Sequence, residues 1–284
     1  MEIKTVGVVG CGLMGSGIVE LIAKNGYAVV VREINDEFLK SGLNRISGSM
    51  ARAVEKNKIS AADRDATWAR IKGTTNMADL ASVDFAIEAA IENLDLKKSI
   101  FKDLDAITRP DVILASNTSS LAVTEMAGVT KRADKVLGLH FFNPVPVMPL
   151  LEIVRTFLTS EETYQTARKF GEGLKKQVIV ARDTPGFIVN ALLVPYLLDA
   201  VRMYENGLGT KEDIDTGVRL GLNHPMGPLT LLDFVGLDTT LFIADACFAE
   251  TKDARYAAPP LLRRMVAAGY NGRKSGKGFY EYGK

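Results

Sequence analysis

Histidines are the first place to look for proton transfer, because imidazole changes its charge near neutral pH. The chain has two, His140 and His224. His140 ends an expected strand, 136–140, and open α/β sheets bind ligands at the carboxyl ends of their strands. Further on, Glu152 is the lone carboxylate of the apolar run 150–154, where burial is costly unless the charge is paired. We predict that Glu152 pairs with His140, holds one tautomer of its ring and makes it a general acid/base.

Two other polar segments contain side chains that can form hydrogen bonds. His224 lies in the loop 223–228, and we interpret it as a turn or cap residue. The run Ser-Asn-Thr-Ser-Ser at 116–120 follows an expected strand and so reaches the same edge of the sheet as His140. Such a run suits either a helix cap or a reaction site, and both interpretations stay open.

A glycine motif follows the first expected strand and opens a helical pattern: Gly10-Cys11-Gly12-Leu13-Met14-Gly15. In a dinucleotide-binding site the first glycine makes a tight turn, the second lets backbone approach the pyrophosphate, and the third lets helix and strand pack closely. The helix N-terminus then offers free N–H groups to the phosphates. Glu33, at the end of the second strand, is placed to accept hydrogen bonds from the adenosine ribose. The segment predicts a Rossmann NAD site.

These residues need a sheet to position them. Short β-branched runs alternate with helical patterns, which is typical of a parallel α/β sheet covered by helices on both faces. The expected strands are 5–9, 28–31, 83–88, 112–115, 136–140, 151–154 and 178–180. The polar excursion 35–72 has helical spacing and predicts an inserted helical hairpin. A capping box at Ser60 and Asp63 opens its second helix, which we expect to end near Gly73.

The pattern of apolar residues changes at Thr184-Pro185-Gly186, where strand patterns stop and helical periodicity begins. We therefore predict a Rossmann-type, doubly wound domain at 1–184 and an all-helical domain at 185–284. The segment 187–201 is apolar almost all round, a pattern typical of a helix buried in a core or an interface.

Composition excludes several classes of function. Among 284 residues, 35 Lys and Arg balance 34 Asp and Glu, so the chain lacks the basic excess of a nucleic-acid-binding protein. No apolar run approaches 18 residues, so we expect no membrane span. Cys11 and Cys247 form neither a disulfide framework nor a zinc motif, and we expect no metal. The first residues run straight into a strand pattern, so we expect no leader peptide and a cytoplasmic location.

Further strings accompany the glycine motif in a fixed order: Ile-Glu-Ala-Ala-Ile-Glu-Asn at 87–93, Ser-Asn-Thr-Ser-Ser at 116–120, His-Phe-Phe-Asn-Pro at 140–144, Asp-Thr-Pro-Gly-Phe-Ile-Val-Asn at 183–190, Asn-His-Pro-Met-Gly-Pro at 223–228 and Gly-Arg-Lys-Ser-Gly-Lys-Gly-Phe-Tyr at 272–280. With them the chain resembles the 3-hydroxyacyl-CoA dehydrogenase family over essentially its whole length, most of all the short-chain bacterial 3-hydroxybutyryl-CoA dehydrogenases. The resemblance implies reversible reduction of acetoacetyl-CoA in butanoate or fatty acid metabolism, with NADH preferred and NADPH possible. It also leaves open a broader acyl range.

The resemblance implies roles for individual residues. His140 would be the acid/base, Glu152 its orienting partner, and Ser119 and Asn190 would hydrogen-bond the reacting oxygen. The cofactor would be held by Gly10, Gly12, Leu13, Met14, Gly15, Glu33, Glu92, Lys97, Asn117, Ser119, Asn143 and Lys274. Arg52 and Lys56 match positions that hold coenzyme A, although a solvated helix face explains them equally well. The helical domain would form a homodimer or a larger homo-oligomer.

The chain differs from the family pattern at two positions, and two other classes of protein are alternatives to this family. Ala191 stands where the family usually has arginine, and Glu33 where most members have aspartate. A β-hydroxyacid or sugar-nucleotide dehydrogenase would need a catalytic Lys or Cys in the helix 191–204, which has neither. A non-catalytic NAD-binding relative, such as a lens crystallin, would have no use for the complete set of four proposed catalytic residues.

Overall fold

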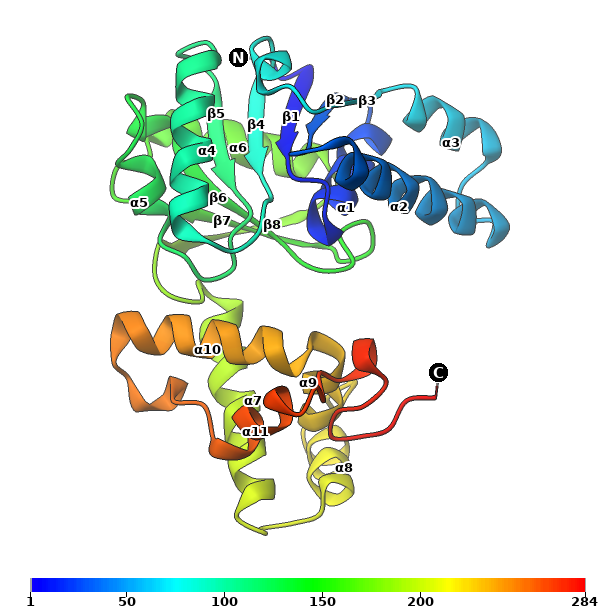
Figure 1. Ribbon diagram of the computed structural model, residues 1–284, viewed down its shortest axis with the longest axis vertical. Coiled ribbons are helices and arrows are strands. Elements are labelled where there is room, and N and C mark those ends of the chain that lie inside the picture. The colour runs from blue at the N-terminus through cyan, green and yellow to red at the C-terminus, as the bar shows by residue number, and fades with distance from the viewer. Residues whose placement is uncertain (1, 284) are drawn as a thin grey trace. The chain divides into compact units, whose positions relative to one another are not determined.

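The computed structural model describes residues 2–283 and contains an eight-stranded sheet in the order β3-β2-β1-β4-β5-β6-β7-β8 (Figure 1). Its strands are β1 (Thr5–Val9), β2 (Ala28–Arg32), β3 (Ile71–Thr74), β4 (Phe85–Glu88), β5 (Ile113–Ser116), β6 (Val136–Phe141), β7 (Leu150–Arg155) and β8 (Gln177–Arg182). All neighbours run parallel except β6 and β7. The predicted Rossmann-type fold class is confirmed.

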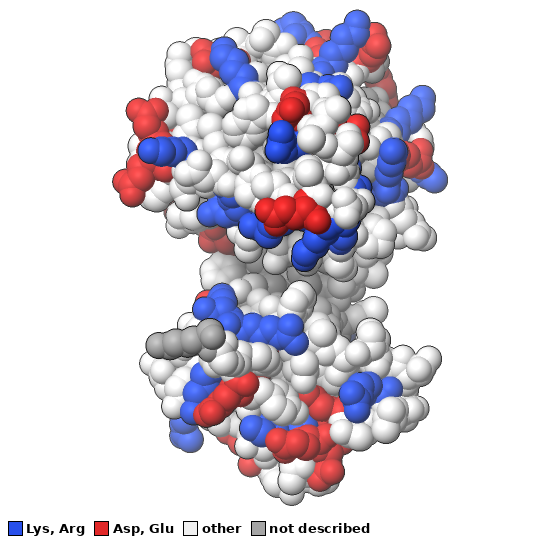
Figure 2. Space-filling view, turned by 90° about the vertical axis from the view of Figure 1, so that its right-hand side faces the viewer, with Lys and Arg blue, Asp and Glu red and all other residues white. Residues whose placement is uncertain are grey.

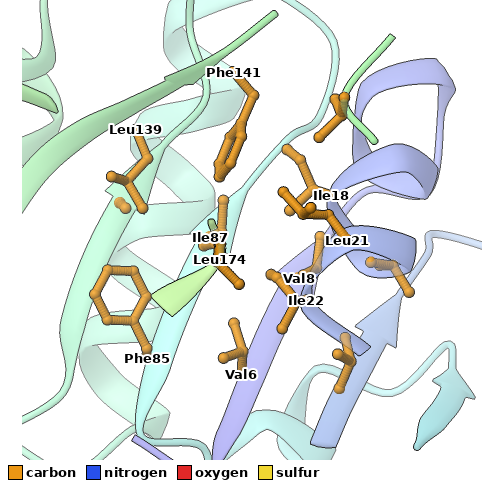
Figure 3. Close-up of a cluster of buried hydrophobic side chains, with 14 of the residues drawn as sticks. Val6, Val8, Ile18, Leu21, Ile22, Phe85, Ile87, Leu139, Phe141 and Leu174 are labelled. Carbon is orange, nitrogen blue, oxygen red and sulfur yellow. The ribbon is translucent and has the colours of Figure 1, made fainter. Parts of the chain in front are cut away.

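Helices cover both faces of the sheet: α1 (Leu13–Lys24), α2 (Asp36–Glu55), α3 (Ala61–Trp68), α4 (Leu94–Ile107), α5 (Val123–Ala127) and α6 (Glu161–Gly173), with 3-10 turns η1 (Met77–Leu80) and η2 (Ala133–Lys135). One face packs under α1 and α6, and α4 and α5 contact each other on the opposite face. Figure 3 shows Val6 and Val8 of β1 beside Ile18 and Ile22 of α1, all buried. This apolar layer keeps β1, and the glycine turn after it, rigid against α1.

The inserted hairpin is formed by α2 and α3, and both contact α1. The capping box at Ser60 and Asp63 is present in both directions. Two expectations here are wrong: the second helix ends at Trp68, and the strand β3 that follows it was not foreseen. The four residues of β3 include a lysine and a glycine and none is fully buried, so this edge strand lacks the apolar run of an interior strand. Gly73 lets Leu39 and Leu43 of α2 pack closely onto it.

The pair β6–β7 departs from the predicted all-parallel sheet. Only residues 142–149 join the two strands, and a parallel crossover needs about a dozen residues or more. The chain therefore turns back on itself, and the antiparallel register places His140 directly opposite Glu152. The reversal brings two residues that are distant in sequence onto one face of the sheet.

The chain divides into two compact units, residues 1–184 and 185–284. Within residues 185–283 the second unit is built from helices, with isolated β-bridges between 272 and 281: α7 (Val189–Glu205), α8 (Lys211–Gly221), α9 (Pro228–Val235), α10 (Leu237–Thr251) and α11 (Pro260–Ala267), with 3-10 turns η3 (Ala254–Tyr256) and η4 (Arg273–Ser275). The apolar segment expected to be buried in a core or an interface divides between the two faces of α7. Leu197, Leu198 and Val201 are fully buried in the unit's core, and Leu192 is 73% exposed.

Charges of both signs are intermixed over the surface that Figure 2 shows, as the near-balance of basic and acidic residues suggests. No helix within residues 2–283 is long and apolar enough to cross a membrane.

Candidate active site

His140 is enclosed at the carboxyl end of β6, with 3% of its surface exposed. Its Nδ1 lies 2.6 Å from Oε2 of the fully buried Glu152, and its Nε2 lies 3.1 Å from Oγ of Ser119. The ring of Phe142 covers it at 4.6 Å between centroids. A buried carboxylate at this distance favours a proton on Nδ1 and leaves Nε2 as the nitrogen that can exchange a proton with another molecule.

Ser119 is held by the turn that follows β5. Its backbone N–H donates to Oε1 of Glu92 at 2.9 Å, and the Thr118 hydroxyl donates a short hydrogen bond to the same oxygen. The neighbouring Asn117 accepts a hydrogen bond from the backbone N–H of Phe141 at 3.0 Å, which ties the turn to the strand that carries His140. The side chains of the polar run at 116–120 do not cap the next helix, α5, whose first N–H groups donate to Asp183 instead.

A buried cluster of charged residues, Lys97, Glu88 and Glu92, holds this turn in place. Lys97 is 1% exposed, and its Nζ lies 2.7 Å from Oε1 of Glu88 and 3.2 Å from Oε2 of Glu92. Glu88 is fully buried at the end of β4 and also accepts from the Ser116 hydroxyl at 2.6 Å. Because the ammonium holds both carboxylates, Glu92 is kept in place beneath Thr118 and Ser119.

The glycine motif has the geometry that a dinucleotide needs. Gly10 has a φ of +99°, which disfavours any side chain. A Cβ on Gly15 would lie 2.0 Å from the Gly10 carbonyl oxygen, whereas a Cβ on Gly12 would meet nothing within 4 Å. Gly12 caps α1 without a side-chain hydrogen bond. The N–H groups of the first turn of α1 are thus open to phosphate oxygens.

A cavity of about 740 Å³ opens beside this motif, lined by Gly10, Gly12, Leu13, Met14 and Glu33 among others. Glu33 directly follows β2, and its carboxylate accepts from the backbone N–H of Cys11 at 2.6 Å and of Ile34 at 3.0 Å. Other lining residues come from the segment after β4, Ala89 and Ala90, and from α4, including Ile100. The size of the cavity, the bare glycine backbone and the acid at the end of β2 fit a nicotinamide dinucleotide.

The remaining predicted residues lie elsewhere. Arg52 and Lys56 are exposed at the C-terminal end of α2 and do not line this cavity. Asn143 is exposed in the loop after β6. Two residues belong to the second unit: Asn190, 8% exposed in the first turn of α7, and Lys274, whose Nζ lies 2.7 Å from Asp238. Their functional roles stay predictions.

Two residues of the site were not singled out from the sequence. Like Glu152, Glu88 is a lone carboxylate in an apolar strand, and this pattern could have identified it. Its partner, Lys97, lies nine residues later in the sequence. Arg45 reaches across from α2 to the carbonyl of Cys11 at 3.1 Å and lines the cavity. Nothing in the local sequence marks Arg45, because its position follows from how α2 packs on the glycine turn.

Comparison with known proteins covers nearly the whole chain. The model of the 3-hydroxyacyl-CoA dehydrogenase NAD binding domain matches residues 5–184, and that of the C-terminal domain matches residues 186–282. A 3-hydroxybutyryl-CoA dehydrogenase of Mycobacterium tuberculosis is 50% identical over 282 residues, 99% of each chain. The mitochondrial hydroxyacyl-coenzyme A dehydrogenase of Homo sapiens is 43% identical over 287 residues, 99% of this chain and 91% of that one. The solved (S)-3-hydroxybutyryl-CoA dehydrogenase of Ralstonia eutropha gives a TM-score of 0.95 at 45% identity, with both chains fully covered.

Proposed function

This chain belongs to the 3-hydroxyacyl-CoA dehydrogenase family, and from that premise we propose that it catalyses the reversible reduction of acetoacetyl-CoA to 3-hydroxybutyryl-CoA with NADH. Relatives with 3-hydroxybutyryl-CoA dehydrogenase names at up to 50% identity support the short-chain substrate. The observation that carries the proposal is the chain of contacts from Glu152 through His140 to Ser119. An oxidoreductase that acts on an alcohol needs such a group to move the hydroxyl proton.

NADH, when bound, supplies the hydride that reduces C3 of the substrate. In this direction His140 acts as an imidazolium: its Nδ1–H donates to Glu152, and its Nε2–H gives the proton to the oxygen of C3 as the C=O bond becomes C–OH. Ser119 and Asn190 donate hydrogen bonds to that oxygen while negative charge develops on it. The Glu152 carboxylate stabilises the imidazolium before the transfer. In the reverse direction neutral Nε2 takes the hydroxyl proton.

Arg52 and Lys56 are proposed to bind the phosphates of coenzyme A. Both are exposed basic residues one helical turn apart at the end of α2, so their charges project from the same face. Replacing both with alanine should raise KM for acetoacetyl-CoA and leave KM unchanged for acetoacetyl-pantetheine, which lacks the nucleotide phosphates. An unchanged KM for acetoacetyl-CoA would favour the solvated-face interpretation.

The absorbance of NADH at 340 nm, followed with acetoacetyl-CoA, tests the activity. We expect rapid oxidation of NADH that is fastest with the four-carbon substrate. Activity that rises with acyl length would instead indicate a broader 3-hydroxyacyl-CoA dehydrogenase. Tight NADH binding without turnover on any acyl length would identify a non-catalytic relative.

We also propose a homodimer, or a larger homo-oligomer, formed through the helical unit, in a cytoplasmic location. Large apolar side chains of that unit are exposed, among them Leu192, Leu208 and Leu220. Cys11 and Cys247 are both buried and unpaired, which suits a reducing compartment.

A further inference from the structure

One wall of the dinucleotide cavity carries more positive charge than NADH requires. Arg32 of β2 and Arg45 of α2 both line it, together with Glu33 and Ser41. The Nε of Arg32 is buried without a hydrogen-bond partner. Arg45 uses one N–H on the carbonyl oxygen of Cys11, 3.1 Å away. Within residues 2–283 neither guanidinium forms a salt bridge with a carboxylate. Guanidinium groups that no carboxylate neutralises are well suited to bind phosphate, because their planar N–H donors match its oxygens.

Glu33 does not neutralise these charges directly. Its two carboxylate oxygens accept from the backbone N–H groups of Cys11 and Ile34. Glu33 and Arg45 therefore bind opposite ends of the same residue, one at the N–H and the other at the carbonyl of Cys11. Burial and the Glu33 carboxylate raise the pKa of the Cys11 thiol to about 12, while Arg45 acts in the opposite direction. The charges of Glu33 and Arg45 therefore both act on Cys11. The thiol itself stays neutral.

The position of this wall identifies the group it would meet. In a Rossmann site the acid at the end of the second strand lies beside the 2′-oxygen of the adenosine ribose. An acid alone selects against a 2′-phosphate, because like charges repel at that position. On the β2–α2 side of the cavity the two guanidinium groups and the Glu33 carboxylate sum to a charge of +1, whereas the fourth charged lining residue, Asp103, comes from α4. A 2′-phosphate on the β2–α2 side therefore meets net attraction instead of an isolated carboxylate.

We propose that Arg32 and Arg45 form a 2′-phosphate subsite, so that the protein binds NADPH as well as NADH. The inference rests on the proposed function for the location of the dinucleotide, and it adds the specificity-determining residues. Glu33 favours the free 2′-hydroxyl of NADH, and the arginines favour the phosphate of NADPH. Their opposing contributions bring the affinities for the two cofactors closer together than Glu33 alone would.

Binding of adenosine fragments tests this without turnover. Isothermal titration with 2′,5′-ADP and with 5′-AMP measures how much the 2′-phosphate contributes to affinity. In Arg32→Ala/Arg45→Ala we expect the affinity for 2′,5′-ADP to fall by roughly 10- to 100-fold, the range for lost hydrogen bonds to a charged group. The affinity for 5′-AMP should change less than about threefold, because 5′-AMP lacks the 2′-phosphate that the two arginines are proposed to contact.

Two controls separate the subsite from general charge and from misfolding. Lys40→Ala removes a positive charge from an exposed position on α2 that does not line the cavity, and it should leave both affinities unchanged. Arg45→Gln keeps a donor for the Cys11 carbonyl but removes the charge, and it should still lose affinity for 2′,5′-ADP. A double variant with an unchanged ratio of the two affinities would overturn the proposal. If wild-type protein binds 5′-AMP and excludes 2′,5′-ADP, only the subsite fails; if it binds neither fragment nor NADH, the proposed function fails with it.

Discussion

His140 has a different neighbour at each ring nitrogen, Glu152 at Nδ1 and Ser119 at Nε2. The proposed proton transfer therefore depends on this one side chain. His140→Ala should reduce kcat by about 100- to 10,000-fold, the usual contribution of a general acid/base. Fluorescence titration should show that NADH still binds, because His140 does not line the dinucleotide cavity. Near-full activity would refute the assignment and make His224 the next candidate.

Glu152 touches the other side of the same ring. Glu152→Gln keeps the size of the side chain and an oxygen acceptor but removes the charge that stabilises the imidazolium. We expect kcat to fall by roughly 10- to 100-fold, the effect of losing a partner that orients an imidazole, and thus by less than in His140→Ala. Steady-state kinetics should show the loss in kcat and little change in KM for NADH. A variant as active as wild type would mean that Glu152 does not orient the ring.

The contact between His140 and Glu152 is predictable from sequence because an unpaired carboxylate in an apolar strand is too costly to bury. The same reasoning applies to Glu88, whose partner Lys97 follows in the next helix. Arg45 illustrates the limit of such reasoning. It lies on a surface helix with many other charged residues, and only the packing of Gly42 against Cys11 brings α2 close enough to the glycine turn for Arg45 to reach it.

At the scale of elements, α4 is fixed to the sheet by the buried ammonium of Lys97, which serves Glu88 on β4 and Glu92 beside it. Lys97→Met should destabilise the protein by about 3–5 kcal/mol, because it leaves buried carboxylates unpaired. Urea unfolding measures this loss. The next residue provides a matched control: Lys98 pairs with Glu125 at the surface, and Lys98→Met should cost at most about 1 kcal/mol. Equal effects of the two substitutions would show that the buried cluster is not what holds α4.

Most of the strands and helices can be predicted from the sequence, but the edge strand β3 and the direction of β7 cannot. Interior strands such as β1 and β5 have apolar runs because both of their faces are covered. The edge strand β3 escapes detection because solvent reaches it, so its composition is not constrained in that way. The reversed direction of β7 has no signature within the strand, and only the short connection 142–149 reveals it.

At the scale of the whole molecule, the proposed oligomer depends on the second unit. Leu192, Leu208 and Leu220 are each at least 70% exposed there, so large apolar side chains are available for contact with a second copy of the chain. Light scattering on the full chain at micromolar concentration should give at least twice the mass of 30.8 kDa. A monomeric mass at that concentration would contradict the proposal.

Each unit has a hydrophobic core of its own: among the described residues, the buried members of the cluster around β1 and α1 run from Val6 to Leu174, and those of the cluster around α7 run from Val194 to Phe279. Heat should therefore unfold the chain in two steps. Nicotinamide dinucleotide should raise the first unit's transition, with about 2.7 kcal/mol of stabilisation at a hundred times its Kd. Protein concentration should raise the transition of the helical unit, because association is linked to that unit's folding. Scanning calorimetry at several concentrations of dinucleotide and of protein measures how each transition depends on each concentration. A single peak that responds equally to dinucleotide and to protein concentration would contradict unfolding in two steps. A melting temperature quoted without both concentrations describes neither half of the chain.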